Sequence, residues 1–337
     1  MKKLVIQIPC LNEATTLPAT LADLPRSVPG IDVVEVLVID DGSRDGTADV
    51  ARALGVDHVV RLRRNKGLAA AFMTGIDACV KQGADYIVNT DADNQYAGHE
   101  IPKLLAPLLS GEADIVIGDR NVSELQHMSW PKRQLQGLGS WVVRQVSNTS
   151  VPDTTSGFRA YTREAALRMT IVSEFSYTLE SIIQAGKKRM AIAHVPVATN
   201  PRTRDSRLFD NLFSYVKRSS ATIVRIYAMY EPLKVFTYLG VTVFGAGFLL
   251  GLRLVYYYFH GEASRHITSA IAAAVLMIVG FQVLVIGLLA DVISGNRKLL
   301  EDLLYRIRTL ELPDVHEVET IRKVETPPVT HAGRGER

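Results

Sequence analysis

Short apolar runs alternate with amphipathic stretches over the first 120 residues of the chain. The runs have the length and β-branched content of buried strands, and they fall at 4–8, 34–39, 58–62, 86–89 and 114–117. Stretches with apolar residues at helical spacing lie between and after them, at 12–24, 45–54, 67–82 and 99–109. Asn12 is expected to cap the first of these helices. Strands that alternate with helices in this way predict a largely parallel sheet covered on both faces.

The pattern is less regular between residues 120 and 207. A helix is predicted over 132–148, and a loop from Pro152 runs into a short strand by Tyr161. Helices at 163–169 and 176–185 and a strand at 191–197 follow, and a basic loop covers 201–207.

Two long uncharged segments dominate the last third of the chain. Val235–Leu252 is an 18-residue run without a charge, and Ile267–Ala290 is a 24-residue run without one. Each is long enough to cross a hydrocarbon core of about 30 Å. A pair of buried helices in a soluble protein is the alternative, which two uncharged runs of this length disfavour. The amphipathic stretch Leu208–Tyr230 before them is interpreted as a helix on anionic lipid or, alternatively, an ordinary surface helix.

The flanking charges predict how this hairpin is oriented. The loop 260–266 is short, so both flanking regions lie on one side of the membrane. Basic residues concentrate in those regions: Lys217, Arg218, Arg225, Lys234, Arg297, Lys298, Arg306 and Arg308. The positive-inside rule therefore places both ends in the cytoplasm. An amphipathic helix is predicted over Asn296–Leu310, and the polar tail from Glu311 is predicted to be disordered.

Composition narrows the protein class. The chain has 337 residues, 47% of them hydrophobic and 22% charged, and a net charge of +3, which is too small to indicate nucleic-acid binding. Its two cysteines, Cys10 and Cys79, make neither a disulfide framework nor a metal cluster, as suits a reducing cytosol. The apolar start is too short and too soon interrupted for a signal peptide, and is interpreted as the first strand.

Polar residues gather where the predicted strands end. They are Asn12-Glu13, Asp40-Asp41, Asp91 with Asp93, and Asp119-Arg120. In open α/β sheets ligands bind beyond the carboxyl ends of the strands, so these clusters predict one site. Asp91 and Asp93 can face a single hard cation such as Mg²⁺ or Mn²⁺, with phosphate oxygens and water completing its coordination. Taken alone, an Asp-x-Asp sequence could equally be a polar turn that ends a strand.

Five motifs begin at Pro9, Val38, Asn65, Asp91 and Ser156, and read PCLNE, VIDDGSRDGT, NKG, DADNQ and SGFRAY. In this order they resemble glycosyltransferase family 2, and within it the polyprenyl-phosphate branch similar to dolichyl-phosphate mannose synthase. The motifs cover about residues 4–207, and the two-span tail resembles the bacterial members. The resemblance implies an α/β fold of the GT-A type, a Rossmann-like domain that binds a nucleotide sugar. It divides the chain into a cytoplasmic catalytic domain (1–207), amphipathic juxtamembrane helices (208–232), a transmembrane hairpin (233–292, with spans at about 233–259 and 267–290), and a cytoplasmic helix and tail (293–337).

The resemblance also assigns roles to residues. The nucleotide-sugar residues would be Pro9, Leu11, Asn12, Glu13, Asp40, Asp41, Gly42, Lys66, Gly67, Asp91 and Ala92. The divalent metal, Mg²⁺ or Mn²⁺, would be held by Asp91, Asp93 and Gln95. The acceptor phosphate would be bound by Arg120, Arg133, Arg202, Arg204 and Ser206. The catalytic residues would be Asp153, Asp93 and Arg120. Asp153 occupies the position of a proposed base, and it could equally orient the loop that follows it.

The predicted activity is therefore inverting transfer of a sugar from a UDP- or GDP-hexose to a polyprenyl phosphate on the cytoplasmic leaflet. Such an enzyme would work on a lipid bilayer, and relatives assemble as homo-oligomers. A processive polysaccharide synthase of the same family is one alternative, but Gln134-Leu135-Gln136-Gly137 lacks the Arg-Trp of the motif typical of those enzymes. A non-catalytic subunit that binds the nucleotide sugar is the other. The presence of Asp91, Asp93, Gln95 and Arg120 disfavours it.

Overall fold

A computed structural model describes residues 1–120, 141, 143–144, 147, 149, 151–172, 177–201, 221, 224–225, 227–260 and 266–311. The chain divides into two compact units, one of Met1–Leu212 with Leu304–Arg337 and one of Phe213–Leu303. The predicted helix at 132–148 and the predicted amphipathic stretch 208–230 lie largely outside the described residues. The basic loop beyond Pro201 and the tail beyond Glu311 lie wholly outside them.

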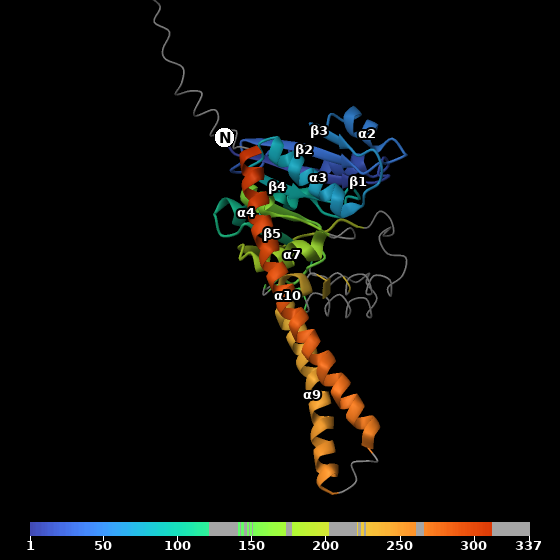
Figure 1. The fold of residues 1–337 in the computed structure, drawn as a ribbon. Coiled ribbons are helices and arrows are strands. Elements are labelled where there is room, and N and C mark those ends of the chain that lie inside the picture. Colours follow the sequence, from blue (N-terminus) through green and yellow to red (C-terminus); the bar gives the residue numbers. More distant parts are fainter. Residues whose placement is uncertain are drawn as a thin grey trace, which may run out of the picture. The chain divides into compact units, whose positions relative to one another are not determined.

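The first unit is built on a seven-stranded sheet of order β3-β2-β1-β4-β6-β5-β7 (Figure 1). The strands are β1 (Lys3–Cys10), β2 (Val33–Asp40), β3 (His58–Arg61), β4 (Tyr86–Asn89), β5 (Ile115–Asp119), β6 (Arg159–Thr162) and β7 (Ile192–Pro196). Strands β3, β2, β1 and β4 are parallel neighbours, and β5 pairs in parallel with β7. All the predicted strands are confirmed, with ends shifted by one or two residues.

The expectation of a largely parallel sheet is confirmed, and one strand departs from it. Strand β6 lies between β4 and β5 and runs antiparallel to both. The chain enters β6 from the loop at 151–158, so that loop lies at the same sheet edge as the end of β4. The antiparallel strand thus brings a segment from late in the sequence beside Asp91.

Helices cover both faces of the sheet (Figure 1). They are α1 (Leu17–Asp23), α2 (Thr47–Ala53), α3 (Leu68–Lys81), α4 (Ile101–Leu109) after the 3₁₀ turn η1 (Gly98–Glu100), α6 (Arg163–Arg168) and α7 (Tyr177–Lys187). Alternate residues of β1 face opposite sides, as a pleated strand requires. Leu4, Ile6 and Ile8 pack with the apolar residues of α1 and α4, whereas Gln7 faces α3.

Asn12 does not cap the first helix, and that expectation is wrong. Helix α1 begins only at Leu17, with Thr16 in the capping position. Asn12 instead has a left-handed backbone, with φ of +55°, and its side chain accepts a hydrogen bond from the backbone of Arg44 at 3.0 Å. A short polar side chain of this kind tolerates the left-handed region and bonds to nearby backbone, which here belongs to a different loop.

The second unit contains two long apolar helices, α9 (Pro232–Phe259) and most of α10 (Ile267–Glu311). Both are long and apolar enough to cross a membrane. The buried residues of α10 are small and recur every seven positions, at Ala273, Gly280, Gly287 and Ser294. A Cβ at Gly280 would lie 2.5 Å from the backbone nitrogen of Phe244, so the two helices touch backbone to backbone.

The helix predicted over Asn296–Leu310 is confirmed, and it is part of α10. This amphipathic segment continues the apolar span without a break. The linking residues, Asp291–Asn296, contain one glycine and no proline, and a single glycine lowers helix stability by only about 1 kcal/mol. Nothing in this stretch forces the helix to end.

Candidate functional site

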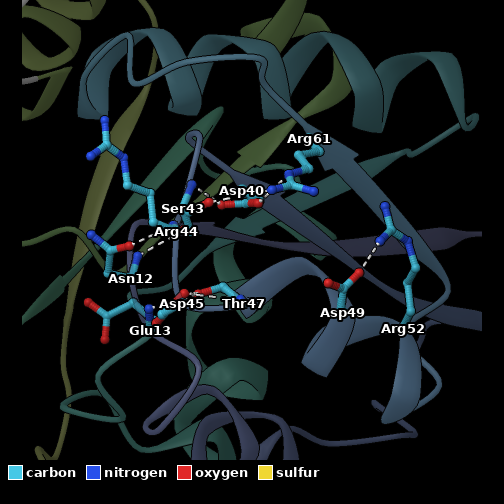
Figure 2. A network of polar contacts seen from close by, with 10 residues as sticks. All are labelled: Asn12, Glu13, Asp40, Ser43, Arg44, Asp45, Thr47, Asp49, Arg52 and Arg61. Atoms are coloured by element: carbon cyan, nitrogen blue, oxygen red, sulfur yellow. Dashed lines mark hydrogen bonds and ion pairs between the residues drawn. The ribbon is translucent and has the colours of Figure 1, made fainter.

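The loops that follow β1 and β2 are joined into one piece at the edge of the sheet (Figure 2). The backbone nitrogen of Asn12 donates to Ser43 Oγ at 2.9 Å, and that of Glu13 donates to Thr47 Oγ1 at 2.9 Å. The Arg44 backbone returns a bond to the Asn12 side chain. Strands β1 and β2 are parallel neighbours, with Cys10 opposite Asp40, so the two loops begin side by side. The three bonds hold the loops in one fixed arrangement.

Asp40 and Asp41 are adjacent and both buried, but their carboxylates have different surroundings. Asp40 Oδ1 accepts from the Ser43 backbone at 2.9 Å, and Arg61 Nε lies 3.3 Å from Oδ2 (Figure 2). That Oδ2 is buried without a hydrogen bond among the described residues. Of the two carboxylates, Asp40 therefore retains capacity to accept a bond from a ligand.

Asp41 organises the backbone of the third predicted motif. Its two oxygens accept from the backbone nitrogens of Lys66 at 2.8 Å and Gly67 at 2.9 Å. Burial raises the pKa of Asp41 despite these donors. Gly42, next in the chain, has φ of +74°, and a Cβ there would lie 2.6 Å from the carbonyl carbon of Arg64. Asp41 and Gly42 thus shape the loop at 64–67 from one side.

Asp91 and Asp93 follow β4, and the Asp93 carboxylate disfavours the ionised form of Asp91. Burial, followed by the Asp93 carboxylate, raises the pKa of Asp91 to about 7, although Arg120 opposes the shift. Asp93 Oδ1 accepts from the backbone of Gln95 at 3.1 Å, which closes a tight turn. Two carboxylates that repel each other at one position form a donor set suited to a divalent cation.

Protein side chains alone would not complete such a metal site. Within the described part of the chain, no three His, Cys, Asp or Glu side chains are placed to hold an ion together. The Asp91 and Asp93 oxygens would leave most coordination positions to oxygens from a ligand or from water, as is common for Mg²⁺. The residues at this position therefore fit a metal that is shared with a phosphate-bearing ligand.

The segment 153–157 lies against this carboxylate pair and is held there on both sides of Gly157. The Gly157 backbone nitrogen donates to Tyr96 Oη at 3.0 Å, and its carbonyl accepts from Asn89 Nδ2 at 2.8 Å. A Cβ at Gly157 would lie 3.1 Å from Asp91 Oδ1, which leaves no slack for a side chain. Asn89 is itself fixed, because Gln7 Nε2 donates to its Oδ1 at 2.9 Å.

Arg159 anchors the same segment from inside the protein. This arginine on β6 is completely buried, with 0% of its surface exposed. Its guanidinium donates to the carbonyls of Thr154 (3.0 Å), Ser156 (2.7 Å) and Thr178 (3.0 Å), and to Ser181 Oγ (2.6 Å). The segment before β6 is thereby tied to the start of α7.

Arg120, which follows β5, forms an ion pair with Asp153, which lies in the segment before β6. Arg120 Nε donates to Asp153 Oδ2 at 2.7 Å, and Nη2 donates to Asp153 Oδ1 at 3.1 Å. Nη2 also donates to Thr155 Oγ1 at 2.9 Å. The pair is largely buried, with side-chain exposures of 14% for Arg120 and 1% for Asp153.

The predicted site residues of the first 160 positions therefore meet at one edge of the sheet, with one exception. Arg133 lies outside the described residues, as do Arg202, Arg204 and Ser206 further along the chain. Asn89 Nδ2 also donates to Tyr177 Oη at 2.8 Å. Sequence reasoning missed the supporting residues Asn89, Tyr96, Arg159 and Tyr177. A polar Asn89 within an apolar strand and a charged Arg159 at the start of another were the available signals, whereas Tyr177 gave none.

Comparisons with known proteins identify the family and several relatives of the chain. Residues 5–169 match the model of glycosyl transferase family 2, and residues 231–295 match the GtrB C-terminal hairpin. An undecaprenyl-phosphate mannosyltransferase of Micrococcus luteus is 30% identical over 200 residues, which cover 56% of this chain and 80% of that protein. Glycosyltransferase AglJ of Haloferax volcanii is 28% identical over 314 residues, which cover 91% and 97%.

A solved structure shares the fold. Glucosyl-3-phosphoglycerate synthase of Mycobacterium tuberculosis, crystallised with Mn²⁺, UDP-glucose and phosphoglyceric acid, superposes with a TM-score of 0.55. It is 22% identical, and the match covers 67% of this chain and 80% of that one. The sheet and its helices are therefore of the GT-A type, as predicted.

Proposed function

The chain belongs to glycosyl transferase family 2, and from that premise we propose that it transfers one sugar from a nucleotide sugar to a polyprenyl phosphate at a membrane surface. One observation carries the proposal. Paired carboxylates and an arginine meet at one sheet edge, in a chain that also has two helices able to span a bilayer. Such a site suits two phosphate-bearing substrates, one from water and one from lipid. The relative from Micrococcus luteus, named for undecaprenyl phosphate, supports the choice of acceptor.

The donor would occupy the edge formed by β1, β2 and β4. The joined loops at 11–13 and 40–47 would hold the nucleotide, and Asp40 Oδ2, which accepts no hydrogen bond among the described residues, would accept one from it. Asp91, Asp93 and Gln95 would hold Mg²⁺ or Mn²⁺. When bound, the cation would neutralise the negative charge that develops on the departing nucleoside diphosphate.

The acceptor phosphate would lie by Arg120, whose planar guanidinium suits phosphate oxygens. Arg133, Arg202, Arg204 and Ser206 complete the proposed phosphate-binding set. The hairpin would keep the site near the lipid head groups, with both chain ends in the cytoplasm and transfer on that leaflet. The exposed leucines of α10, such as Leu299 and Leu303, offer a surface for a homo-oligomer.

The chemistry is a single displacement with inversion. A phosphate oxygen of the acceptor forms a bond to the anomeric carbon with its own electron pair. The bond from that carbon to the nucleoside diphosphate breaks, and its electrons leave with the diphosphate. A phosphomonoester has a second pKa near 6, so at neutral pH the attacking oxygen is already deprotonated.

The experiment is a donor screen with the purified full chain. UDP- and GDP-sugars are supplied separately with Mn²⁺ or Mg²⁺ and a short acceptor, citronellyl phosphate, and release of the nucleoside diphosphate is followed. Release is expected with one donor class, only when acceptor and cation are both present, and not with citronellol, which lacks the phosphate. Equal release with citronellol, or growth of a polymer, would contradict the proposal.

A further inference from the structure

The ion pair of Arg120 and Asp153 leaves little of the aspartate free to react. Asp153 Oδ2 accepts from Arg120 Nε, and Oδ1 accepts from Arg120 Nη2. Oδ1 also accepts from the backbone nitrogen of Thr155 at 3.2 Å and from its hydroxyl at 3.0 Å. Oδ1 receives three of these four bonds and Oδ2 receives one, so the position left open on the carboxylate lies at Oδ2, beside Arg120 Nε.

The surroundings of Asp153 also oppose proton uptake. Burial by itself would raise its pKa, but the Arg120 guanidinium and Thr155 hold the pKa of Asp153 below its ordinary value. Tyr96, whose pKa burial raises, and Asp91 are further titratable groups near the arginine. A general base works best with a pKa near the working pH, so Asp153 is displaced in the wrong direction for that role.

The same contacts orient Arg120. Asp153 and Thr155 fix Nε and Nη2, and the guanidinium carbon lies 5.9 Å from the centre of the Tyr96 ring. Among the described residues, none makes a hydrogen bond to Nη1. The guanidinium is therefore held through Nε and Nη2, and Nη1 is the nitrogen available to an anion.

We propose that Asp153 is a positioning residue that holds Arg120 for the acceptor phosphate, and that it is not the base of the reaction. This inference rests on the proposed function. The acceptor oxygen needs no base, because it attacks as part of a phosphate dianion. Arg120 without its carboxylate partner would retain its charge but lose the orientation that a planar fork needs to bind phosphate.

The test compares Asp153→Asn, Arg120→Gln and the double variant in transfer to citronellyl phosphate. Positioning predicts that Asp153→Asn raises the KM for the acceptor about tenfold or more, changes kcat less than that, and leaves the pH profile of kcat like that of the wild type. It also predicts that the double variant is no slower than Arg120→Gln alone, because the two side chains act as one unit. Asp77→Asn is the control, since Asp77 also faces an arginine, Arg308, at 3.5 Å but lies on α3, away from the site.

A base role makes opposite predictions. Asp153→Asn would then lower kcat by about 10²- to 10⁴-fold with little change in the acceptor KM. The remaining rate would rise with pH, and the effects of the two substitutions would multiply. Any of these results would overturn the proposal.

A binding measurement separates this inference from the proposed function. Calorimetric titration of citronellyl phosphate without donor is expected to give about tenfold weaker binding for Asp153→Asn than for the wild type. Unchanged binding would contradict the positioning role. An inactive wild type that still binds citronellyl phosphate in an Asp153-dependent manner would refute the proposed transfer but support the positioning.

Discussion

Replacing Arg159 tests whether the segment before β6 is held in place from inside the protein. The substitution is Arg159→Met, which keeps much of the apolar stem and removes the guanidinium. Three carbonyls, of Thr154, Ser156 and Thr178, would lose a charged donor at 2.7–3.0 Å in a region without solvent exposure. The segment would then be free to shift away from the Asp91 carboxylate.

The expected loss in the free energy of unfolding follows from these contacts. A buried acceptor that loses a donor costs about 1–3 kcal/mol, and the Thr178 carbonyl keeps a bond from Ser181 Oγ at 3.1 Å, so the total for the three carbonyls should be near roughly 3–5 kcal/mol. At about 2–4 °C per kcal/mol, the midpoint of thermal unfolding should fall by about 6–20 °C. A misplacement of about 1 Å at a reacting centre costs up to about 100-fold in rate, so kcat should fall as well.

The assay is thermal unfolding in detergent, followed by transfer at a temperature where the variant is folded. Arg163→Met is the matched control, because Arg163 is only half-buried and donates to the carbonyls of Val80 and Ala84 away from the site. It should lose stability without a matching loss of kcat. If Arg159→Met melts within about 2 °C of the wild type and keeps its rate, the segment is held by other contacts and the reasoning is refuted.

Three further predictions concern glycines and the metal. Gly280→Ala forces a Cβ to within 2.5 Å of the Phe244 backbone and should destabilise the hairpin by about 1–3 kcal/mol. The control Gly245→Ala places its Cβ where nothing lies within 4 Å and should not destabilise it, so equal melting temperatures of the two variants would contradict the close packing. Gly157→Ala should weaken binding of Mn²⁺ and lower kcat about tenfold, because the added Cβ crowds the Asp91 carboxylate proposed to bind the metal. Calorimetry with UDP present measures the Mn²⁺ binding, and wild-type values would show that the segment has room for the Cβ. Asp93→Asn should lower cation-dependent transfer by about 10²- to 10³-fold with unchanged melting, and a rate near that of the wild type would remove Asp93 from the metal site.

Much of the sheet edge was predictable because its chemistry is local. A short apolar run in the sequence marks each strand of the first 120 residues, and parallel strands bring their carboxyl ends together. Asp40, Asp91 and Arg120 follow such runs by one, two and three residues. Their convergence follows from topology alone, and the structure confirms it.

The contacts that hold the site could not be predicted in the same way. The pairing of Arg120 with Asp153 joins residues 33 positions apart, and it exists because β6 enters the sheet antiparallel beside β4. The four residues of β6 do not by themselves determine which strands β6 will pair with. Asn12 failed as a predicted cap for a related reason, since its partner is a loop more than 30 residues away.

The mass of the lipid product tests the central claim most directly. Wild-type protein and Asp93→Asn are incubated with the donor identified in the screen, a divalent cation and a long polyprenyl phosphate, and the lipid fraction is analysed by mass spectrometry. The account predicts a single new species, heavier than the acceptor by one sugar residue, which Asp93→Asn does not form. A series of species with many sugars, or an acceptor that stays unmodified while the donor is consumed, would contradict it.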